Sequence, residues 1–284
     1  MRNTHKYSVL SCALPVLIHT LYLHTHVYET HGIQIALMAM SKDKEYDMNI
    51  RFSELKQSMI GQLDRNSVVA NNLANVNSNG YKRDVMFSEV MKSNNKSSVK
   101  NQIATDFSQG DLRQTNNPLD MAISGPGMFT IDDGNQTAYT RDGHFTRGSD
   151  GFLQTSSGKP VMGQAGWIDL GRGLGSVGEV RIGTGGDVHV DDELIDTLEI
   201  SYFGKQSDLK KVGANLFTAK PGAIDHRIEE PKIMQGKIEG SNVVAVHEMV
   251  ELIELQRNFQ TSQKALQALD NAVGKAANSI GAYK

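Results

Sequence analysis

Hydrophobic positions recur at alternating steps of three and four near both ends of the chain, which is the spacing of one face of an α-helix. In the first segment the seam positions are Phe52, Leu55, Met59, Gln62, Asn66, Val69, Leu73 and Val76. In the second they are Leu252, Leu255, Phe259, Ser262, Leu266, Leu269, Val273, Ala276 and Ile280. The pattern predicts a long amphipathic helix near each end, each with an apolar stripe.

The residues flanking these stripes predict where the helices end and begin. The run Asn-Ser-Asn-Gly at 77–80 favours a stop to the first helix, because Asn and Ser bond their own backbone and Gly80 adopts positive φ easily. Ser241 and Asn242 stand just before the second apolar run. Either side-chain oxygen is a candidate N-cap for the second helix.

The region between the helices has the pattern of short strands separated by turns. Turn sequences such as Asp-Asp-Gly-Asn at 132–135 and Ser-Asp-Gly at 149–151 punctuate it. The predicted strands are 121–131, 139–145, 151–155, 179–182, 188–190 and 197–203. The Ser/Asn/Lys-rich stretch 92–100 favours a loop. The predicted fold class is α+β, with coiled-coil-like terminal helices flanking a central antiparallel β-rich domain.

These patterns divide the chain into five parts. Residues 1–47 precede the regular pattern and are interpreted as an extension, with translation starting at Met48, Met38 or Met40; a weak signal sequence and a membrane anchor are alternatives. The remaining parts are an N-terminal helix, a polar connection, a β-rich domain and a C-terminal helix, at 48–82, 83–109, 110–235 and 236–284.

Composition removes several classes of function. A formal net charge of −3 and a pI near 6.3 give no basic footprint for nucleic acid. The single cysteine is Cys12, so disulfides, thiolate metal sites and a cysteine nucleophile are excluded from the body of the chain. Neither cofactor nor small-molecule substrate is expected.

Three motifs suggest chemistry, and for each a structural interpretation is favoured. Residues 173–178 fit G-x-G-x-x-G but lack a following helical pattern, which favours a loop. The pairs Asp132-Asp133 and Asp191-Asp192 could serve glycan hydrolysis, yet both fall at predicted turns. The histidines show no metal-ligand spacing; they include His24, His26, His31, His144, His189, His226 and His247. We therefore predict no catalytic and no metal-binding residues.

Two segments carry a specific resemblance to a known family. ANNLANVNSNGYK at 70–82 resembles the N-terminal signature of the flagellar rod and hook axial proteins, and GKIEGSNVVAVHEMV at 236–250 resembles that family's entry into its C-terminal helix. QGDL at 109–112, LDMAI at 119–123, GPGMF at 125–129 and AYTRDGHF at 138–145 are similar to its first β segment. The family commonly has another Asn where Val244 or Ala245 stands here. The resemblance covers about residues 48–284, and is closest to the proximal rod protein, with the distal one next.

The resemblance implies a structural subunit of the flagellar basal-body rod, which serves motility. Such subunits leave the cell through the flagellar type III export apparatus and join copies of themselves and other rod subunits in a periplasm-spanning helical tube, with their terminal helices in its inner layer. The implied signature and assembly residues are Asn71, Asn72, Leu73, Asn75, Gly80, Tyr81, Ser241, Asn242 and Val243. The asparagines are expected to satisfy backbone groups or to bridge subunits.

Two alternatives stay open at this point. The two apolar stripes could cover each other in a closed hairpin, which would suit a periplasmic binding or adaptor module. The carboxylate pairs could belong to a wall-degrading enzyme. Periodicity alone does not separate a closed hairpin from helices that are covered by neighbouring copies.

Overall fold

The structure, a computed structural model, describes residues 52–93, 96–171, 178–213 and 215–281. The chain divides into two units. A central unit, Gly61–Gln260, contains every strand that is described, and a terminal unit combines Met1–Ile60 with Thr261–Lys284. The predicted extension at 1–47, with its histidines, lies outside the described residues.

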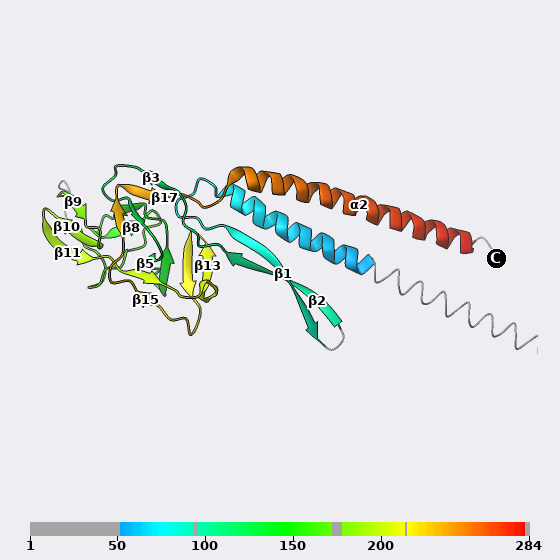
Figure 1. The fold of residues 1–284 in the computed structure, drawn as a ribbon, viewed down its shortest axis with the longest axis horizontal. Coiled ribbons are helices and arrows are strands. Elements are labelled where there is room, and N and C mark those ends of the chain that lie inside the picture. Colours follow the sequence, from blue (N-terminus) through cyan, green and yellow to red (C-terminus); the bar gives the residue numbers. More distant parts are fainter. Residues whose placement is uncertain (1–51, 94–95, 172–177, 214, 282–284) are drawn as a thin grey trace, which may run out of the picture. The chain divides into compact units, whose positions relative to one another are not determined.

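One helix opens the described chain and another closes it (Figure 1). The N-terminal helix covers residues 52–74, and a turn follows at 75–80. Helix α2 spans Ala245–Gly281 and has 37 residues. Both predicted helices are therefore present, and the first ends two residues before the predicted Val76.

The expected N-cap of the second helix is wrong. Helix α2 begins at Ala245, and the amide of Glu248 donates to the carbonyl of Val244 at 3.2 Å, so the first turn starts after the predicted cap residues. The Ser241 hydroxyl instead accepts from the amide of Val243 at 3.2 Å. The Asn242 side chain instead forms hydrogen bonds with residues far away in sequence, and is therefore not available as a local cap.

Residues 84–93 and 96–105 form two paired strands where a loop was expected at 92–100. Strand β1, Asp84–Ser93, pairs antiparallel with β2, Lys96–Thr105, in a register from Asp84 opposite Thr105 to Ser93 opposite Lys96. Backbone pairing does not depend on apolar side chains, so polar composition hid this pair of strands.

A six-stranded antiparallel sheet forms the centre of the β region, in the order β13-β14-β6-β5-β12-β15. Its strands are β5 Met128–Asp132, β6 Thr137–Thr140, β12 Ile200–Tyr202, β13 Leu209–Gly213, β14 Leu216–Ala219 and β15 His226–Arg227. A short 3₁₀ helix, η1, Gln206–Asp208, precedes β13.

Smaller antiparallel sheets surround it. A three-stranded sheet has the order β11-β10-β9, formed by Glu193–Thr197, Asp187–Val190 and Val180–Ile182. Two-stranded pairs join β7 with β8, β4 with β16 and β3 with β17. These strands are β7 Phe145–Arg147, β8 Leu153–Thr155, β4 Met121–Ile123, β16 Ile233–Gln235, β3 Leu112–Gln114 and β17 Lys237–Glu239.

The main core lies among these sheets. Phe129 and Phe145 meet edge to face in it, with ring centroids 5.1 Å apart. A second buried cluster contains Met128, Tyr139, Phe203, Leu209 and Phe217. Most members of both clusters lie in the short strands, for example Phe129 in β5 and Phe217 in β14.

Two predicted strands are each interrupted, and glycines explain why. The predicted strand 121–131 splits into β4 and β5 because Gly125 and Gly127 have φ of +107° and +122°. The predicted strand 139–145 splits into β6 and β7 at Gly143, where a Cβ would lie 1.6 Å from the Met121 carbonyl oxygen. The predicted class, α+β with a helix near each end of a β-rich region, is correct at this level.

Candidate functional site

The segments with the two strongest sequence motifs lie side by side. The amide of Gly80 donates to the Glu239 carbonyl at 2.8 Å, and the amide of Asn242 donates to the Tyr81 carbonyl at 3.4 Å. Strand β17 at the same time pairs with β3, in the register of Ile238 opposite Arg113. We call the polar residues gathered here the junction cluster: Asn72, Tyr81, Lys82, Arg83, Arg141, Glu239, Asn242 and Glu248.

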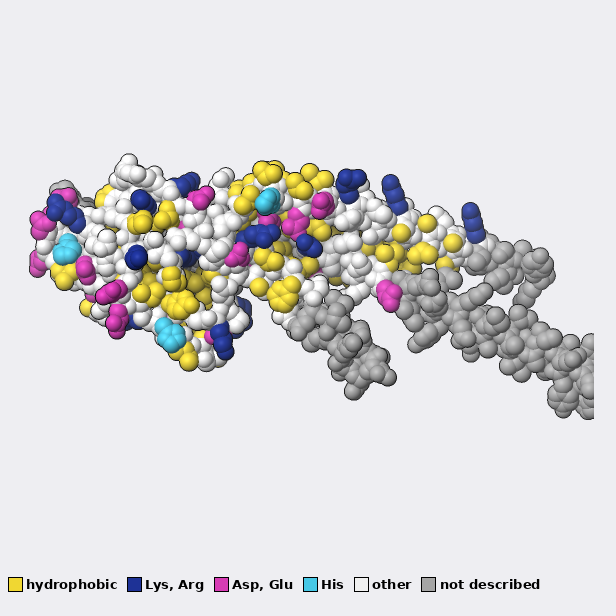
Figure 2. Space-filling view, viewed as in Figure 1, with side chains coloured by type: hydrophobic (Ala, Val, Ile, Leu, Met, Phe, Trp, Pro, Cys, Tyr) yellow, Lys and Arg dark blue, Asp and Glu magenta, His cyan; other side chains and the backbone are white. Residues whose placement is uncertain are grey.

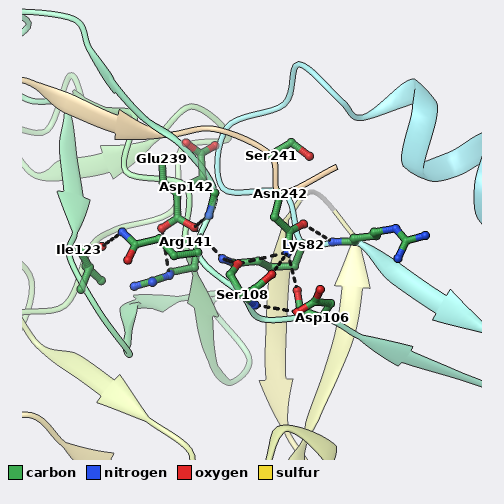
Figure 3. A network of polar contacts seen from close by, with 12 residues as sticks. Lys82, Asp106, Ser108, Ile123, Arg141, Asp142, Glu239, Ser241 and Asn242 are labelled. Carbon is green, nitrogen blue, oxygen red and sulfur yellow. Dashed lines mark hydrogen bonds and ion pairs between the residues drawn. The ribbon is translucent and has the colours of Figure 1, made fainter. Parts of the chain in front are cut away.

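A buried ionic triad forms the centre of the cluster (Figure 3). Lys82 Nζ lies 2.6 Å from Glu239 Oε1, and both side chains are 1% exposed. Arg141 Nε lies 3.2 Å from Glu239 Oε2. Oε1 also accepts from the amide of Gly110 at 2.9 Å, and Lys82 donates to the Ser108 carbonyl at 2.6 Å. The carboxylate of Glu239, which precedes α2, thus joins Lys82 after the N-terminal helix to Arg141 in the β region.

Burial disfavours the charges of both cations in this triad. It lowers the pKa of Lys82 and that of Arg141, and in each case Glu239 acts in the opposite direction. Buried ions of this kind are tolerated only when they are paired, and removing one partner is costly. The triad therefore ties the three segments together in one arrangement.

Asn72 connects the N-terminal helix to the chain that follows it. Its side chain is 1% exposed and accepts from the amide of Asp84 at 3.0 Å while it donates to the Asp84 carbonyl at 2.9 Å. The Tyr81 hydroxyl donates to the same Asn72 oxygen at 3.2 Å. The Asn72 amide group also reaches Glu248 Oε2 on helix α2, at 3.2 Å. This side chain therefore satisfies backbone groups and bridges the two helices of the central unit.

Glu248 and Asn242 complete the contacts between the two ends. Glu248, 1% exposed, accepts from Arg83 Nε at 2.6 Å. Asn242 Oδ1 accepts from the amide of Arg83 at 2.7 Å, and its amide nitrogen donates to the carbonyls of Asp106 and Ser108 at 2.9 and 3.2 Å. An amide has both donors and an acceptor, so this side chain can bond three backbone groups at once and hold residues 83 and 106–108 beside the start of α2.

Gly80 allows the chain to pass close to the β region. Its φ is +62°, and a Cβ there would lie 2.3 Å from the amide nitrogen of Asp142. Tyr81 next to it is buried, with Lys211 Nζ 4.0 Å from its ring centroid. Burial, with a smaller contribution from Asp84, raises the pKa of Tyr81 to about 12. The site is a polar junction in which hydrogen bonds and ion pairs hold the chain after the N-terminal helix against the start of α2 and the β region.

Comparison with known proteins agrees with this organisation of the chain. Residues 234–279 match the family described as flagellar basal body rod FlgEFG protein C-terminal, and residues 122–199 match the flagellar hook protein FlgE/F/G D1 domain. The flagellar basal-body rod protein FlgF of Caulobacter vibrioides is 33% identical over 220 residues, which are 70% of this chain and 84% of that protein. The chain belongs to the flagellar basal-body rod protein family. It is a structural protein of the bacterial flagellar basal body.

Other relatives carry a second name. The rod protein FlgG of Buchnera aphidicola from Schizaphis graminum is 30% identical over 240 residues, 74% of this chain and 91% of that protein. FlgG of Borreliella burgdorferi is 31% identical over 245 residues, with the same coverage. Relatives of both names match at similar identity, so closeness to the proximal rod protein stays a prediction.

The structure separates the predicted signature residues into two groups. Asn72, Gly80, Tyr81, Asn242 and Val243 are in the junction or buried beside it. Asn71 is exposed, Leu73 is half-buried, and the Asn75 side chain donates locally to the Asn71 carbonyl at 2.8 Å.

Sequence reasoning missed the charged members of the junction cluster. Lys82, Arg83, Arg141, Glu239 and Glu248 were not singled out, although four of them are under 5% exposed. The available signal was the position of Lys82, Arg141, Glu239 and Glu248 inside the segments that carry the resemblance.

Predicted seam residues differ in how far they are covered. Val69 and Leu255 in the central unit are buried, and Val76, Leu252 and Phe259 are half-buried. In the terminal unit Leu55, Met59 and Leu266 are half-buried, while Leu269 and Val273 are exposed. The side chain of Ile280 lies outside the described residues.

The motifs that suggested other chemistry have structural partners. Asp132 accepts from the amide of Gly134 at 2.8 Å and Asp133 pairs with Lys159. Asp191 and Asp192 occupy the turn between β10 and β11 with φ of +51° and +67°. Residues 172–177, most of the G-x-G-x-x-G motif, lie outside the described residues. Within the described chain, we find no helix with both the length and the apolar character needed to span a membrane.

Proposed function

We propose that this rod subunit assembles through its terminal helices, packing as coiled-coil-like elements against neighbouring copies and other rod subunits after export by the flagellar type III apparatus. The observation that carries the proposal is a second apolar stripe on α2, formed by Val246, Met249, Val250 and Ile253. These side chains are 67%, 48%, 50% and 55% exposed. Their spacing places them on one helix face.

This exposed stripe lies away from the seam that the sequence predicted. At about 100° per residue, the stripe and Leu255 are on opposite sides of α2. Leu255 faces the N-terminal helix, because residues of both helices line one small cavity: Gln62, Leu63, Asn66, Leu255, Gln256, Phe259 and Gln260. The predicted seam is thus partly used within the subunit, as the closed-hairpin alternative required.

The stripe remains to be covered, and this favours assembly over the closed binding module. Figure 2 shows hydrophobic side chains gathered over the beginning of α2. Contiguous exposed apolar residues mark surfaces that bind other proteins. The junction cluster supports the proposal because it fixes the start of α2 relative to the β region, so that the stripe is presented by a rigid support.

A structural role rather than a catalytic one is part of the proposal. The carboxylates that could serve glycan hydrolysis have structural partners. Asp132 accepts hydrogen bonds from the Trp167 ring and from the Gly134 amide. Asp133 pairs with Lys159, and Asp192 pairs with Arg181. We expect Asp132→Asn to leave flagellar assembly unchanged and the purified protein to release no sugar from cell-wall glycan. Release of sugar that is lost in Asp132→Asn would favour the enzyme instead.

The test counts flagellar filaments by electron microscopy in a strain that lacks this protein. Complementation with residues 48–284 should restore filaments, whereas Val250→Asp and Ile253→Asp should not, since each places a charge in an apolar interface. Asn258→Asp, on the polar flank of α2, is the matched control and should restore filaments.

Stability measurements distinguish loss of assembly from loss of folding. Val250 and Ile253 are half exposed, so each substitution should change the free energy of unfolding by less than about 0.5 kcal/mol. Normal filaments with both aspartate variants would refute assembly through this stripe.

A further inference from the structure

A cavity of about 560 Å³ opens beside the junction cluster. Three of the segments that carry the family resemblance meet there: Gln109, Gly125–Met128 and Arg141 line it. Its apolar wall consists of Phe107, Met128, Phe203 and Leu209, which belong to or pack against the second buried cluster. Nothing in the junction described above requires this cavity.

Arg141 gives the cavity a cation with unused hydrogen-bonding capacity. The residue is 4% exposed, its Nε faces Glu239 and its Nη2 donates to the Gly125 carbonyl at 2.6 Å. Nη1 is buried and has no hydrogen-bond partner among the described residues. Lys82 and Arg141 share the single negative charge of Glu239, so the triad carries net positive charge. A buried donor on a cation favours a carboxylate ligand.

The loop at 125–127 lines the cavity, and its backbone conformation depends on glycine. Gly125 and Gly127 both have positive φ, and a Cβ on Gly127 would lie 2.7 Å from Ile200 Cγ2. Gln109 holds this loop, because its amide donates to the Ile123 carbonyl at 3.0 Å and its oxygen accepts from the Gly125 amide at 3.1 Å. The cavity is therefore a built feature of ordered backbone.

The chain itself carries a segment whose chemistry matches. Strand β11 is an edge strand of its sheet and begins with Glu193, Leu194 and Ile195. Leu194 and Ile195 are 56% and 38% exposed. Glu193 is exposed and makes no ion pair with any described residue. A free carboxylate beside exposed aliphatic side chains complements a cavity with an apolar wall and a buried arginine.

We propose that this cavity binds the Glu193–Ile195 edge of a second copy, with the Glu193 carboxylate directed to Arg141 and Ile195, on the same face of β11, against the apolar wall. The inference rests on the proposed function, since it concerns contact between subunits, but it uses a different surface. A contact between two different patches of one chain does not close as a two-fold dimer; it repeats as an open helical array when its rotation does not close into a ring, as a rod requires.

Paired cysteines test this contact. In a Cys12→Ser background, Glu193→Cys and Tyr202→Cys chains are co-expressed in cells and also mixed as purified proteins at high concentration. Tyr202 lines the cavity and is 40% exposed. We expect a disulfide-linked dimer only when both variants are present. Glu229→Cys, an exposed glutamate outside the cavity, replaces Glu193→Cys as the matched control and should give none.

A substitution that fills the cavity provides a second test, in which the cross-linked fraction is measured. Gly204 lines the cavity, and a Cβ on it meets nothing within 4 Å. Gly204→Trp should therefore fold normally and lower the cross-linked fraction at least tenfold, whereas Val212→Trp, exposed and outside the cavity, should not.

Three results would overturn the proposal: no cross-link in either setting, a cross-link of the Tyr202→Cys variant only to a different protein, or cross-linking that Gly204→Trp leaves unchanged. Failure here with loss of filaments in Val250→Asp would leave assembly through the helices standing. Cross-linking together with normal filaments in Val250→Asp and Ile253→Asp would support the cavity and refute the helical stripe.

Discussion

Replacing Glu239 by Gln tests whether the buried triad holds the two ends of the subunit together. The substitution keeps the size of the side chain and removes its charge. Glutamine can still accept from Lys82 and Gly110 through one oxygen, but its amide group would then present donors to Arg141 Nε, which lies 3.2 Å from Glu239 Oε2. Two cations, 1% and 4% exposed, would lose the counter-charge that they share.

The expected loss is large relative to the stability of a domain. Breaking a buried ion pair by removing one partner costs about 3–5 kcal/mol, because an uncompensated charge stays buried. Native domains have free energies of unfolding of about 5–15 kcal/mol. We therefore expect Glu239→Gln to lower the free energy of unfolding by about 3–5 kcal/mol and to leave a protein that still folds at low temperature.

Urea unfolding followed by tryptophan fluorescence measures the effect. The single tryptophan, Trp167, lies in the β region, where its ring centroid is 5.5 Å from that of Phe152. Glu230→Gln, at an exposed position, is the matched control and should change the free energy of unfolding by less than about 0.5 kcal/mol. A loss below about 1 kcal/mol in Glu239→Gln would refute the argument from buried charge.

A double substitution assigns the loss to the ion pair. Lys82→Met removes one of the two cations that Glu239→Gln leaves uncompensated. The combined loss should then be smaller than the sum of the single losses by about 1–3 kcal/mol. Additive losses would mean that the two side chains contribute independently.

Three further predictions concern neighbouring residues. Gly80→Ala should lower the free energy of unfolding by more than about 2 kcal/mol through left-handed strain and backbone contact, against little change for Gly204→Ala; equal losses would refute the contact argument. Asn72→Ala should cost about 2–4 kcal/mol by leaving buried partners unsatisfied, whereas the exposed Asn71→Ala should be near neutral in the same urea assay. Because Tyr81 has a pKa of about 12 when folded against 10.0 ordinarily, the folded state keeps its proton and stability should fall as pH rises from 10 to 12; an ultraviolet titration in which every tyrosine ionises near 10 would contradict this.

Much of the candidate site could be located, but not explained, from sequence. The motif at 70–82 and the one at 236–250 pointed to both sides of the junction cluster. Asn72, Tyr81 and Asn242 belong to this cluster, and Gly80 directly precedes Tyr81. The charged members were missed because Lys82 and Glu239 are 157 residues apart in sequence, and no local pattern reports that two distant charges are buried together. Asn242 was assigned a local cap for the same reason.

The sequence by itself determined the helices at both ends, the β-rich centre and the family, because helical periodicity and turn chemistry are local and the motifs are long. It also predicted the seam at Val69 and Leu255, which the structure buries. It did not report the paired strands at 84–93 and 96–105, since strand pairing is made by backbone groups of either polarity.

Only the tertiary structure decided which surfaces remain available. The stripe from Val246 to Ile253 fits helical spacing as well as the seam does, and its exposure became known only once the N-terminal helix was seen to cover the opposite face of α2. The cavity at Arg141 likewise exists only where segments from 107 to 209 meet. Periodicity shows that a face is apolar, whereas what covers that face depends on contacts between segments that are far apart in the chain.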